Sequence, residues 1–259
     1  MTFDVHESDR PDAPTVLLSA GLGGAAGYWA PQLAALTPRY RVITYDQMGT
    51  GRAKATQLPA GYSIADMADQ VVEILDATKT ETCHFVGHAL GGLVGVDLAL
   101  RTPRRLHSLS VVNGWATADA HTRRCFEIRV QLLKHAGPEA YTRAQPIFLY
   151  PASWLAANEQ RMVQEDAHAL SGFQGTNNLL RRIEALLAFD ATPRLGELDL
   201  PVFLMAARDD VLVPCSQSER LAKTIKGATL HMSEWGAHGV NVTDPGRFNR
   251  ALLPFLDRC

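Results

Sequence analysis

The sequence predicts an α/β protein with a doubly wound, mostly parallel sheet and a helical insertion. Six short apolar runs alternate with amphipathic helical patterns, which is typical of a parallel sheet covered on both faces. Between Phe85 and Gly92 a strand pattern runs directly into a glycine-rich turn and a helix. The stretch from about Trp115 to about Asp190 is mostly helical and contains no convincing strand.

Size and composition suit one globular domain. The chain has 259 residues, of which 46% are hydrophobic and 20% charged, so it can bury a substantial core. With 25 Lys and Arg against 27 Asp and Glu, the formal net charge is -2. We expect no nucleic-acid partner, because such partners require a basic surface. We expect no membrane association, because no apolar stretch approaches the ~20 residues that span a bilayer.

The N-terminus and the cysteines indicate the compartment. The first 14 residues are polar and lack the basic start and apolar run of a secretory signal. The cysteines, Cys83, Cys125, Cys215 and Cys259, lie far apart, and no Cys or His cluster has zinc spacing. The sequence therefore predicts a cytoplasmic protein with free thiols, no metal and no cofactor.

The predicted strands are short and continuously apolar, as strands buried on both faces are. They are Thr15–Ala20, Val42–Tyr45, His84–Gly87, Leu106–Val112, Val202–Ala206 and Thr229–Met232.

Helical patterns fall between these strands. Ser63 and Asp66 form a predicted capping box, followed by apolar residues at helical spacing. A second helix, Leu90–Leu100, is rich in glycine where it must pack closely on the sheet. A last helix begins at Asp244-Pro245, since proline suits the first helical turn.

The helical insertion divides the chain. We predict a core made of residues 1–113 and 191–259, and a cap made of residues 114–190. Helical insertions between sheet strands commonly act as lids over active sites. A small helical subdomain without a gating role is the alternative.

The segment Gly87-His88-Ala89-Leu90-Gly91 has the form of a nucleophile elbow, G-x-S-x-G, with alanine at its centre. The flanking glycines let a chain turn sharply between strand and helix. A methyl group cannot attack a carbonyl, so Ala89 closes the ordinary acyl-enzyme route. His88 is expected to pack beside the turn.

An acid and a histidine follow later strands in the order nucleophile, acid, histidine that is typical of the α/β-hydrolase fold. Asp210 and His238 each come shortly after a predicted strand, where ligands bind in open α/β sheets. Asp210 would orient the His238 ring and stabilise its protonated form. Asp209 is the competing acid. We prefer Asp210 because it lies four residues before Pro214, as in many members of this fold.

The loop Ser19–Gly24 follows the first predicted strand. In this fold it supplies one backbone N–H of an oxyanion hole, and the residue after the nucleophile supplies the other. These donors would be Leu22 and Leu90. Backbone donors do not depend on the missing serine, so an oxyanion hole can persist.

The same loop matches a dinucleotide fingerprint, Gly21-x-Gly23-x-x-Ala26, with Asp46 placed about 20 residues on as the ribose acid. A dinucleotide-dependent oxidoreductase is therefore an alternative. We rank it second because it explains neither the elbow nor the later acid and histidine. The following helix also starts late, near Tyr28.

Pocket residues are predicted from position alone. Asn113 and Trp115 leave the carboxyl end of a strand and are candidates to line the substrate pocket, with packing or capping as the alternative. Four arginines of the cap would attract a small anion, although charges on a lid helix usually face solvent; they are Arg123, Arg124, Arg181 and Arg182. His121 is expected to be structural.

With the elbow, the acid and the histidine in this order, the chain resembles the α/β-hydrolase superfamily over nearly its whole length. Four blocks in or next to the cap are more specific, namely Asn113-Gly-Trp115, Ala120-His-Thr-Arg-Arg-Cys-Phe126, Gln145-Pro-x-Phe-Leu-Tyr-Pro151 and Phe173-Gln-Gly-x-Asn-Asn-Leu-Leu-Arg-Arg182. These blocks resemble the RutD family of the Rut pyrimidine-degradation pathway. The RutD pattern also carries alanine at the elbow. The resemblance implies a hydrolase of uracil and thymine breakdown that acts on carbamate or 3-aminoacrylate.

Both substrates are labile and need only proton transfer. We hypothesise that His238, held by Asp210, acts as a general acid and base, since a histidine of pKa ~6.5 exchanges protons at cellular pH. The Leu22 and Leu90 amides would hold a substrate oxygen. The expected partner is a small-molecule substrate, and a homodimer is compatible with the sequence. Two further alternatives are a ligand-binding protein without activity and a serine esterase inactivated by design at Ala89.

Overall fold

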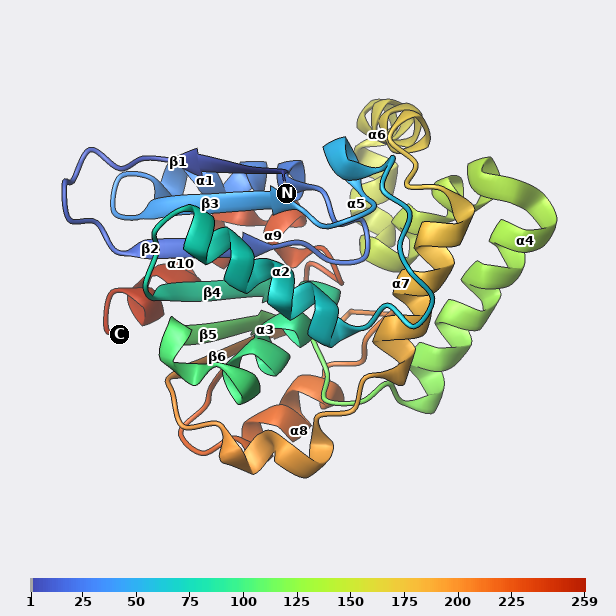
Figure 1. The fold of residues 1–259 in the computed structure, drawn as a ribbon. Coiled ribbons are helices and arrows are strands. Elements are labelled where there is room, and N and C mark those ends of the chain that lie inside the picture. The colour runs from blue at the N-terminus through green and yellow to red at the C-terminus, as the bar shows by residue number, and fades with distance from the viewer. Residues whose placement is uncertain (1) are drawn as a thin grey trace.

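The computed structural model describes residues 2–259 and contains a seven-stranded sheet with helices on both faces (Figure 1). The strand order is β1-β3-β2-β4-β5-β6-β7. All neighbouring strands are parallel except β1 and β3. The strands are β1 Thr2–His6, β2 Thr15–Ser19, β3 Arg41–Asp46, β4 Cys83–His88, β5 Leu106–Val112, β6 Val202–Ala207 and β7 Thr229–Ser233.

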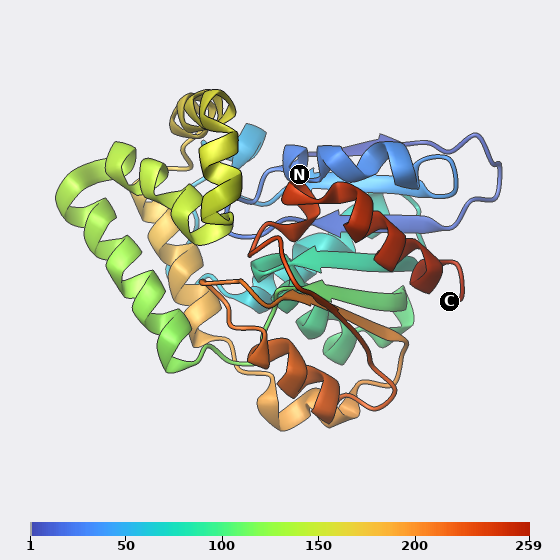
Figure 2. The ribbon, with the colours of Figure 1, turned by 180° about the vertical axis from the view of Figure 1, so that it is seen from behind.

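Helices α2, α3 and α8 cover one face of the sheet, and α1 and α10 cover the other (Figures 1 and 2). Helices α4 to α7 belong to the cap. The helices are α1 Ala30–Leu36, α2 Ile64–Ala77, α3 Leu90–Arg101, α4 Ala120–Leu149, α5 Ala152–Ala157, α6 Glu159–Ser171, α7 Thr176–Ala188, α8 Ser216–Thr224, α9 Val240–Thr243 and α10 Pro245–Leu256.

The sheet has a separate hydrophobic core on each face. On β4, Phe85 packs into the core under α2 and α3, while the next residue, Val86, packs into the core under α1 and α10. Successive side chains of a strand point to opposite faces. Both are buried here, which explains the continuous apolar runs. The predicted doubly wound α/β fold is confirmed.

Each of the six predicted strands agrees with an observed strand to within one residue at either end. Strand β1 was missed, because its half-buried Phe3 and Val5 alternate with polar residues at the sheet edge. Helix α8 was also missed. The predicted capping box is present, since the Ser63 hydroxyl and the Asp66 carboxylate each accept a hydrogen bond from the other residue's backbone amide.

The cap lies beyond the carboxyl ends of the parallel strands (Figures 1 and 2). A bridge between Thr117 and Asp190 brings its two ends together beside the sheet. Helix α4 is bent at Gly137, which has a φ of 85°. Among residues 2–259, no helix has the length and apolar character required to cross a bilayer.

Candidate active site

The turn after β4 is tightly enclosed. A Cβ atom on Gly91 would lie 2.3 Å from the Ser19 carbonyl oxygen, and one on Gly87 would lie 2.3 Å from the Gly91 oxygen. Both positions therefore require glycine. Ala89 at the tip has a positive φ of 46°, a conformation that non-glycine residues rarely adopt. The elbow geometry is thus present around a residue that carries no nucleophile.

His238 and Asp210 form a buried pair. The Nδ1 atom of His238 lies 2.7 Å from Asp210 Oδ2, and the two side chains are 3% and 0% exposed. The other carboxylate oxygen accepts hydrogen bonds from the Leu212 and Val213 amides at 2.8 and 2.9 Å. Asp209 instead accepts hydrogen bonds from two amides just before His238. Asp210 is therefore the acid in contact with the imidazole.

The protonation pattern of the His238 ring follows from this pair. A carboxylate only accepts hydrogen bonds, so Nδ1 of His238 must carry a proton and donate it to Asp210. The second ring nitrogen, Nε2, makes no hydrogen bond to any described residue. It remains available to give a proton to a bound molecule or to take one from it.

The His238 ring lies beside the elbow. The ring of His88, which directly precedes Ala89, has its centre 4.7 Å from the centre of the His238 ring. His88 Nε2 donates a hydrogen bond to the His238 carbonyl oxygen at 2.8 Å. Burial, with a smaller contribution from His238, lowers the pKa of His88 well below its ordinary value. His88 is therefore neutral and supports the position of His238.

The two predicted oxyanion-hole residues, Leu22 and Leu90, belong to segments that meet at this turn. A Cβ atom on Gly21 would lie 3.6 Å from Ala89 Cβ, so the loop after β2 meets the elbow there. Within the described chain, the N–H groups of Leu22 and Leu90 donate no hydrogen bond. Leu90 is the first residue of α3, and the first N–H groups of a helix have no partner within it.

The side chain of Asn113, a candidate pocket residue, makes the packing contacts that the sequence left open as the alternative. Its side-chain Nδ2 donates hydrogen bonds to the Ala237 and His238 carbonyl oxygens at 3.2 and 2.7 Å. Its Oδ1 accepts one from the Ala207 amide at 3.2 Å. The side chain is 1% exposed, so Asn113 holds the segment that carries His238. Its position after β5 was predicted, but its inward-facing contacts left no signal in the sequence.

Trp115 is also buried, with 1% exposure. Its indole Nε1 has no hydrogen-bond partner among the described residues. A buried indole usually finds such a partner. Trp115 remains a proposed pocket residue.

The arginines of the cap differ from the expectation that all four face solvent. Arg123 and Arg124 are exposed and Arg181 is half-buried, whereas Arg182 is completely buried. A second arginine, Arg129, was overlooked and is 2% exposed. Both buried arginines occupy the apolar face of a helix, and this periodicity was the signal that could have revealed them.

The cap contacts three loops of the site, which carry Asp210, His238 and Leu22. His121 of α4 donates a hydrogen bond from Nε2 to the Val211 oxygen at 2.8 Å, beside Asp210. The Gly239 amide donates one to the Leu149 oxygen at the end of α4. Gln174, just before α7, donates one to the Leu22 oxygen at 3.3 Å. The cap therefore covers the acid, the histidine and the oxyanion loop.

The dinucleotide interpretation does not fit this geometry. Asp46 Oδ1 accepts a hydrogen bond from the Ala26 amide at 2.8 Å, and its other oxygen pairs with Arg52. Both carboxylate oxygens of Asp46, the predicted ribose-binding acid, are thus already bonded within the protein. The helix after the glycine loop, α1, begins only at Ala30. Among residues 2–259, no group of three or more His, Cys, Asp or Glu is arranged to hold a metal ion.

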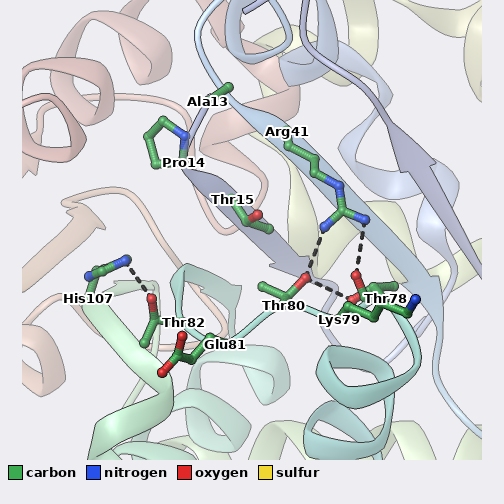
Figure 3. A pocket seen from close by; sticks show the side chains of 10 residues that line it. All are labelled: Ala13, Pro14, Thr15, Arg41, Thr78, Lys79, Thr80, Glu81, Thr82 and His107. Carbon is green, nitrogen blue, oxygen red and sulfur yellow. Dashed lines mark hydrogen bonds between the residues drawn. The ribbon is translucent and has the colours of Figure 1, made fainter. Parts of the chain in front are cut away.

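A shallow hollow lies at the opposite, amino-terminal end of the parallel strands (Figure 3). Thr15, Arg41 and His107 stand at or next to the starts of β2, β3 and β5. Arg41 donates hydrogen bonds to Thr80 Oγ1 and the Thr78 oxygen across the hollow. This hollow is separate from the candidate active site.

Comparison with known proteins identifies the fold family of the chain. The sequence profile of the alpha/beta hydrolase fold matches residues 14–245, so the chain belongs to the α/β-hydrolase fold family. A solved hydrolase from Pseudomonas aeruginosa superposes with a TM-score of 0.86 at 28% sequence identity, covering 98% of this chain and 93% of that one.

Two similar proteins identify the family within this fold. Both are named "Putative carbamate hydrolase RutD". The protein from Variovorax paradoxus is 54% identical over 257 residues, covering 99% of this chain and 96% of the relative. The protein from Agrobacterium fabrum is 48% identical over 256 residues, covering 99% and 98%. The chain belongs to the RutD family, and hydrolase is its general functional class.

Proposed function

We propose that the protein is a cytoplasmic hydrolase of uracil and thymine breakdown that acts on a C–N bond of a small labile substrate, carbamate or 3-aminoacrylate. The names of the relatives support the carbamate substrate. The observation that carries the proposal is the buried His238–Asp210 pair beside an elbow that holds Ala89. This site can transfer protons but cannot form an acyl-enzyme.

In the proposed mechanism His238 acts as a general acid and then as a general base. Its Nε2 gives a proton to the substrate, and Asp210 stabilises the imidazolium before transfer. With 3-aminoacrylate, the neutral ring then takes a proton from the attacking water. With carbamate no water attacks, and the ring regains its proton from solvent. The Leu22 and Leu90 amides hold a substrate oxygen in place. Positioned proton transfer of this kind typically accelerates a reaction by ~10²–10⁴-fold.

The proton balance differs between the two substrates. Carbamate is protonated on nitrogen, the C–N bond breaks, and ammonia and carbon dioxide leave. 3-Aminoacrylate is protonated on the carbon next to the carboxylate and becomes an iminium ion. Water adds to the iminium carbon, and the C–N bond of the resulting adduct breaks to release ammonia and an aldehyde. Neither route needs a serine.

The test is His238→Ala, assayed on freshly generated carbamate and 3-aminoacrylate with the spontaneous rate subtracted. We expect the enzyme-dependent rate to fall about 10²-fold or more. His107→Ala is the matched control, because His107 is exposed at the far end of the sheet. An enzyme-dependent rate that survives in His238→Ala would refute the mechanism.

Asp210→Asn tests the orienting acid separately. An amide in place of the carboxylate keeps the shape but no longer stabilises the imidazolium. We expect a lower rate with a changed pH profile and an intact fold. An unchanged pH profile would show that the carboxylate has no part in the reaction.

The second candidate function is a ligand-binding protein without activity, which the missing nucleophile at Ala89 favours. Fold alone does not determine function. Substrate binding measured together with turnover separates the two, since this alternative requires binding with no rate above background.

A further inference from the structure

Arg182 is the most unusual charged group of the site region. It projects from α7 and is completely buried. Among residues 2–259 it forms no salt bridge with a carboxylate. Its Nη2 donates hydrogen bonds to the Leu22 oxygen at 3.3 Å and to Gln47 Oε1. Its Nε and Nη1 atoms are buried without any described partner.

A buried cation of this kind is costly unless an anion compensates it. Burial lowers the pKa of Arg182 to about 10, so the guanidinium remains charged at neutral pH. The titratable groups that act on the charge of Arg182 are Tyr62 and Tyr45. Burial raises the pKa of both phenols, and they are therefore neutral. The protein itself supplies no negative charge in contact with Arg182.

The unpaired guanidinium lies next to the oxyanion loop. Arg182 bonds the carbonyl oxygen of Leu22, whose own N–H is one of the two predicted oxyanion-hole donors and has no partner among the described residues. Backbone geometry places the N and O atoms of one residue within ~4 Å. The guanidinium is therefore within roughly 7 Å of the Leu22 amide nitrogen. Gln174 bonds the same carbonyl oxygen, and its Oε1 is also buried without a partner.

We propose that Arg182 is the carboxylate-binding residue of the active site and that the protein selects small monoanions bearing a planar CO₂⁻ group. A guanidinium keeps its charge and holds its N–H donors in fixed directions, which suits charge-assisted hydrogen bonds to a carboxylate. The free Nε and Nη1 atoms of Arg182 lie on different edges of the group, so either can give a carboxylate one such hydrogen bond. The inference rests on the proposed function for the reaction, but binding of the anion does not depend on turnover.

The chemistry of the two substrates supports this assignment. Both are anions that carry a CO₂⁻ group. In carbamate the atom that accepts the proton is the nitrogen bonded to the carboxylate carbon. In 3-aminoacrylate it is the carbon bonded to the same position. One guanidinium that fixes the carboxylate would therefore place the proton-accepting atom of either substrate at the same distance from the His238 ring.

Sodium acrylate, which lacks the amino group and does not react, is the probe. We expect calorimetry to show saturable binding to the wild-type protein and binding to Arg182→Met that is weaker by roughly 10- to 100-fold. Acrylamide, the uncharged analogue, should bind weakly and equally to both. Arg124→Met is the matched control, because Arg124 is an exposed arginine of the same cap, and it should bind acrylate like the wild type.

The alternative is that Arg182 only positions the Leu22 loop. In that case Arg182→Met lowers kcat while acrylate binding stays unchanged, and this result would overturn the proposal. Arg182→Lys, which keeps the charge but not the fixed directions of the guanidinium donors, should raise KM more than it lowers kcat. If Arg182→Met fails to fold, the Nε–H signals of the wild type in NMR provide the test. Acrylate must shift one buried arginine signal that is absent from Arg182→Lys; no such shift contradicts the proposal.

Failure of this inference is distinguishable from failure of the proposed function. His238→Ala should lose turnover and still bind acrylate. Acrylate binding that is equal in the wild type and in Arg182→Met, with His238-dependent turnover intact, would reject only the role of Arg182.

Discussion

Two polar side chains of the strand-end loops and two arginines of the cap differ in how completely they are hydrogen-bonded. In the loops, Asp210 is bonded to His238 and two backbone amides, and every polar atom of the Asn113 side chain has a backbone partner. In the cap, Arg129 and Arg182 are equally buried, yet each has two guanidinium nitrogens without a partner among the described residues.

This difference separates a framework from a binding surface. A fully bonded network fixes its members in one arrangement. An incompletely bonded cation costs free energy, and such a cost is typical of sites that serve a ligand rather than the fold. We therefore expect the bonded loop residues to stabilise the fold and the incompletely bonded cap arginines to contribute little to it.

The largest effect is expected for Asn113→Ala. The substitution leaves the Ala207 amide and the Ala237 carbonyl oxygen without a partner, removes one of two hydrogen bonds to the His238 carbonyl oxygen, and puts alanine at a φ of 49°. We expect the free energy of unfolding in urea to fall by about 4 kcal/mol, and the His238-dependent rate to fall with it. Asn177→Ala, at an exposed position of α7, is the control. A decrease in the free energy of unfolding of less than about 1 kcal/mol would show that Asn113 does not stabilise the fold.

The next effect is a loss of stability in acid that originates in the core. His84 bonds Ser108 inside the sheet, and burial lowers its pKa from 6.5 to about 4. Below pH 6.5 the unfolded chain therefore binds a proton that the folded chain does not. Stability is full above pH 6.5 and is lost as the pH falls towards 4, by about 3 kcal/mol. The buried His88 acts in the same direction.

His84→Gln checks this assignment in urea unfolding measured from pH 7 to pH 4. The variant should show a shallower fall in stability than the wild type. His135→Gln, at an exposed position of the cap, should leave the fall unchanged. Equal slopes for all three proteins would show that the acid sensitivity arises elsewhere.

The smallest effect is expected for Arg129→Met in the cap. Arg129 bonds Tyr141 at 3.1 Å and lies 4.7 Å above the Phe126 ring. Losing these contacts is offset by removing a buried charge that no carboxylate compensates. The free energy of unfolding should change by less than about 1 kcal/mol. Leu133→Ala, on the same helix face, should cost about 3 kcal/mol and shows that the assay detects the cap. A comparable loss for Arg129→Met would mean that this arginine supports the fold.

The sequence was sufficient for the elements that obey one simple rule. Strands buried on both faces were placed to within one residue, because their apolar runs are interrupted by glycine, proline or charged residues. Asp210 and His238 were brought together by topology, since both follow parallel strands that end at one edge. Of the two adjacent aspartates, the one preferred from the sequence, Asp210, is the one that contacts the imidazole.

The sequence was insufficient for residues whose burial differs from what their charge predicts. Arg129 stands between Phe126 and Leu133, and Arg182 stands between Leu179 and Leu186, each at the i+3 position of a buried i, i+7 pair. Charge predicted exposure, whereas the periodicity of the helix placed both arginines inside. Asn113 was assigned by its position at a strand end, and only three-dimensional contacts show that it supports its neighbours.

The methyl group of Ala89 also has a kinetic consequence. A serine hydrolase must free itself from a covalent adduct in every cycle, and reagents that phosphorylate or sulfonylate the serine stop it permanently. This chain keeps the strained turn and offers those reagents no atom to modify. Its progress curves should show no initial burst, and fluorophosphonate probes should leave it unlabelled.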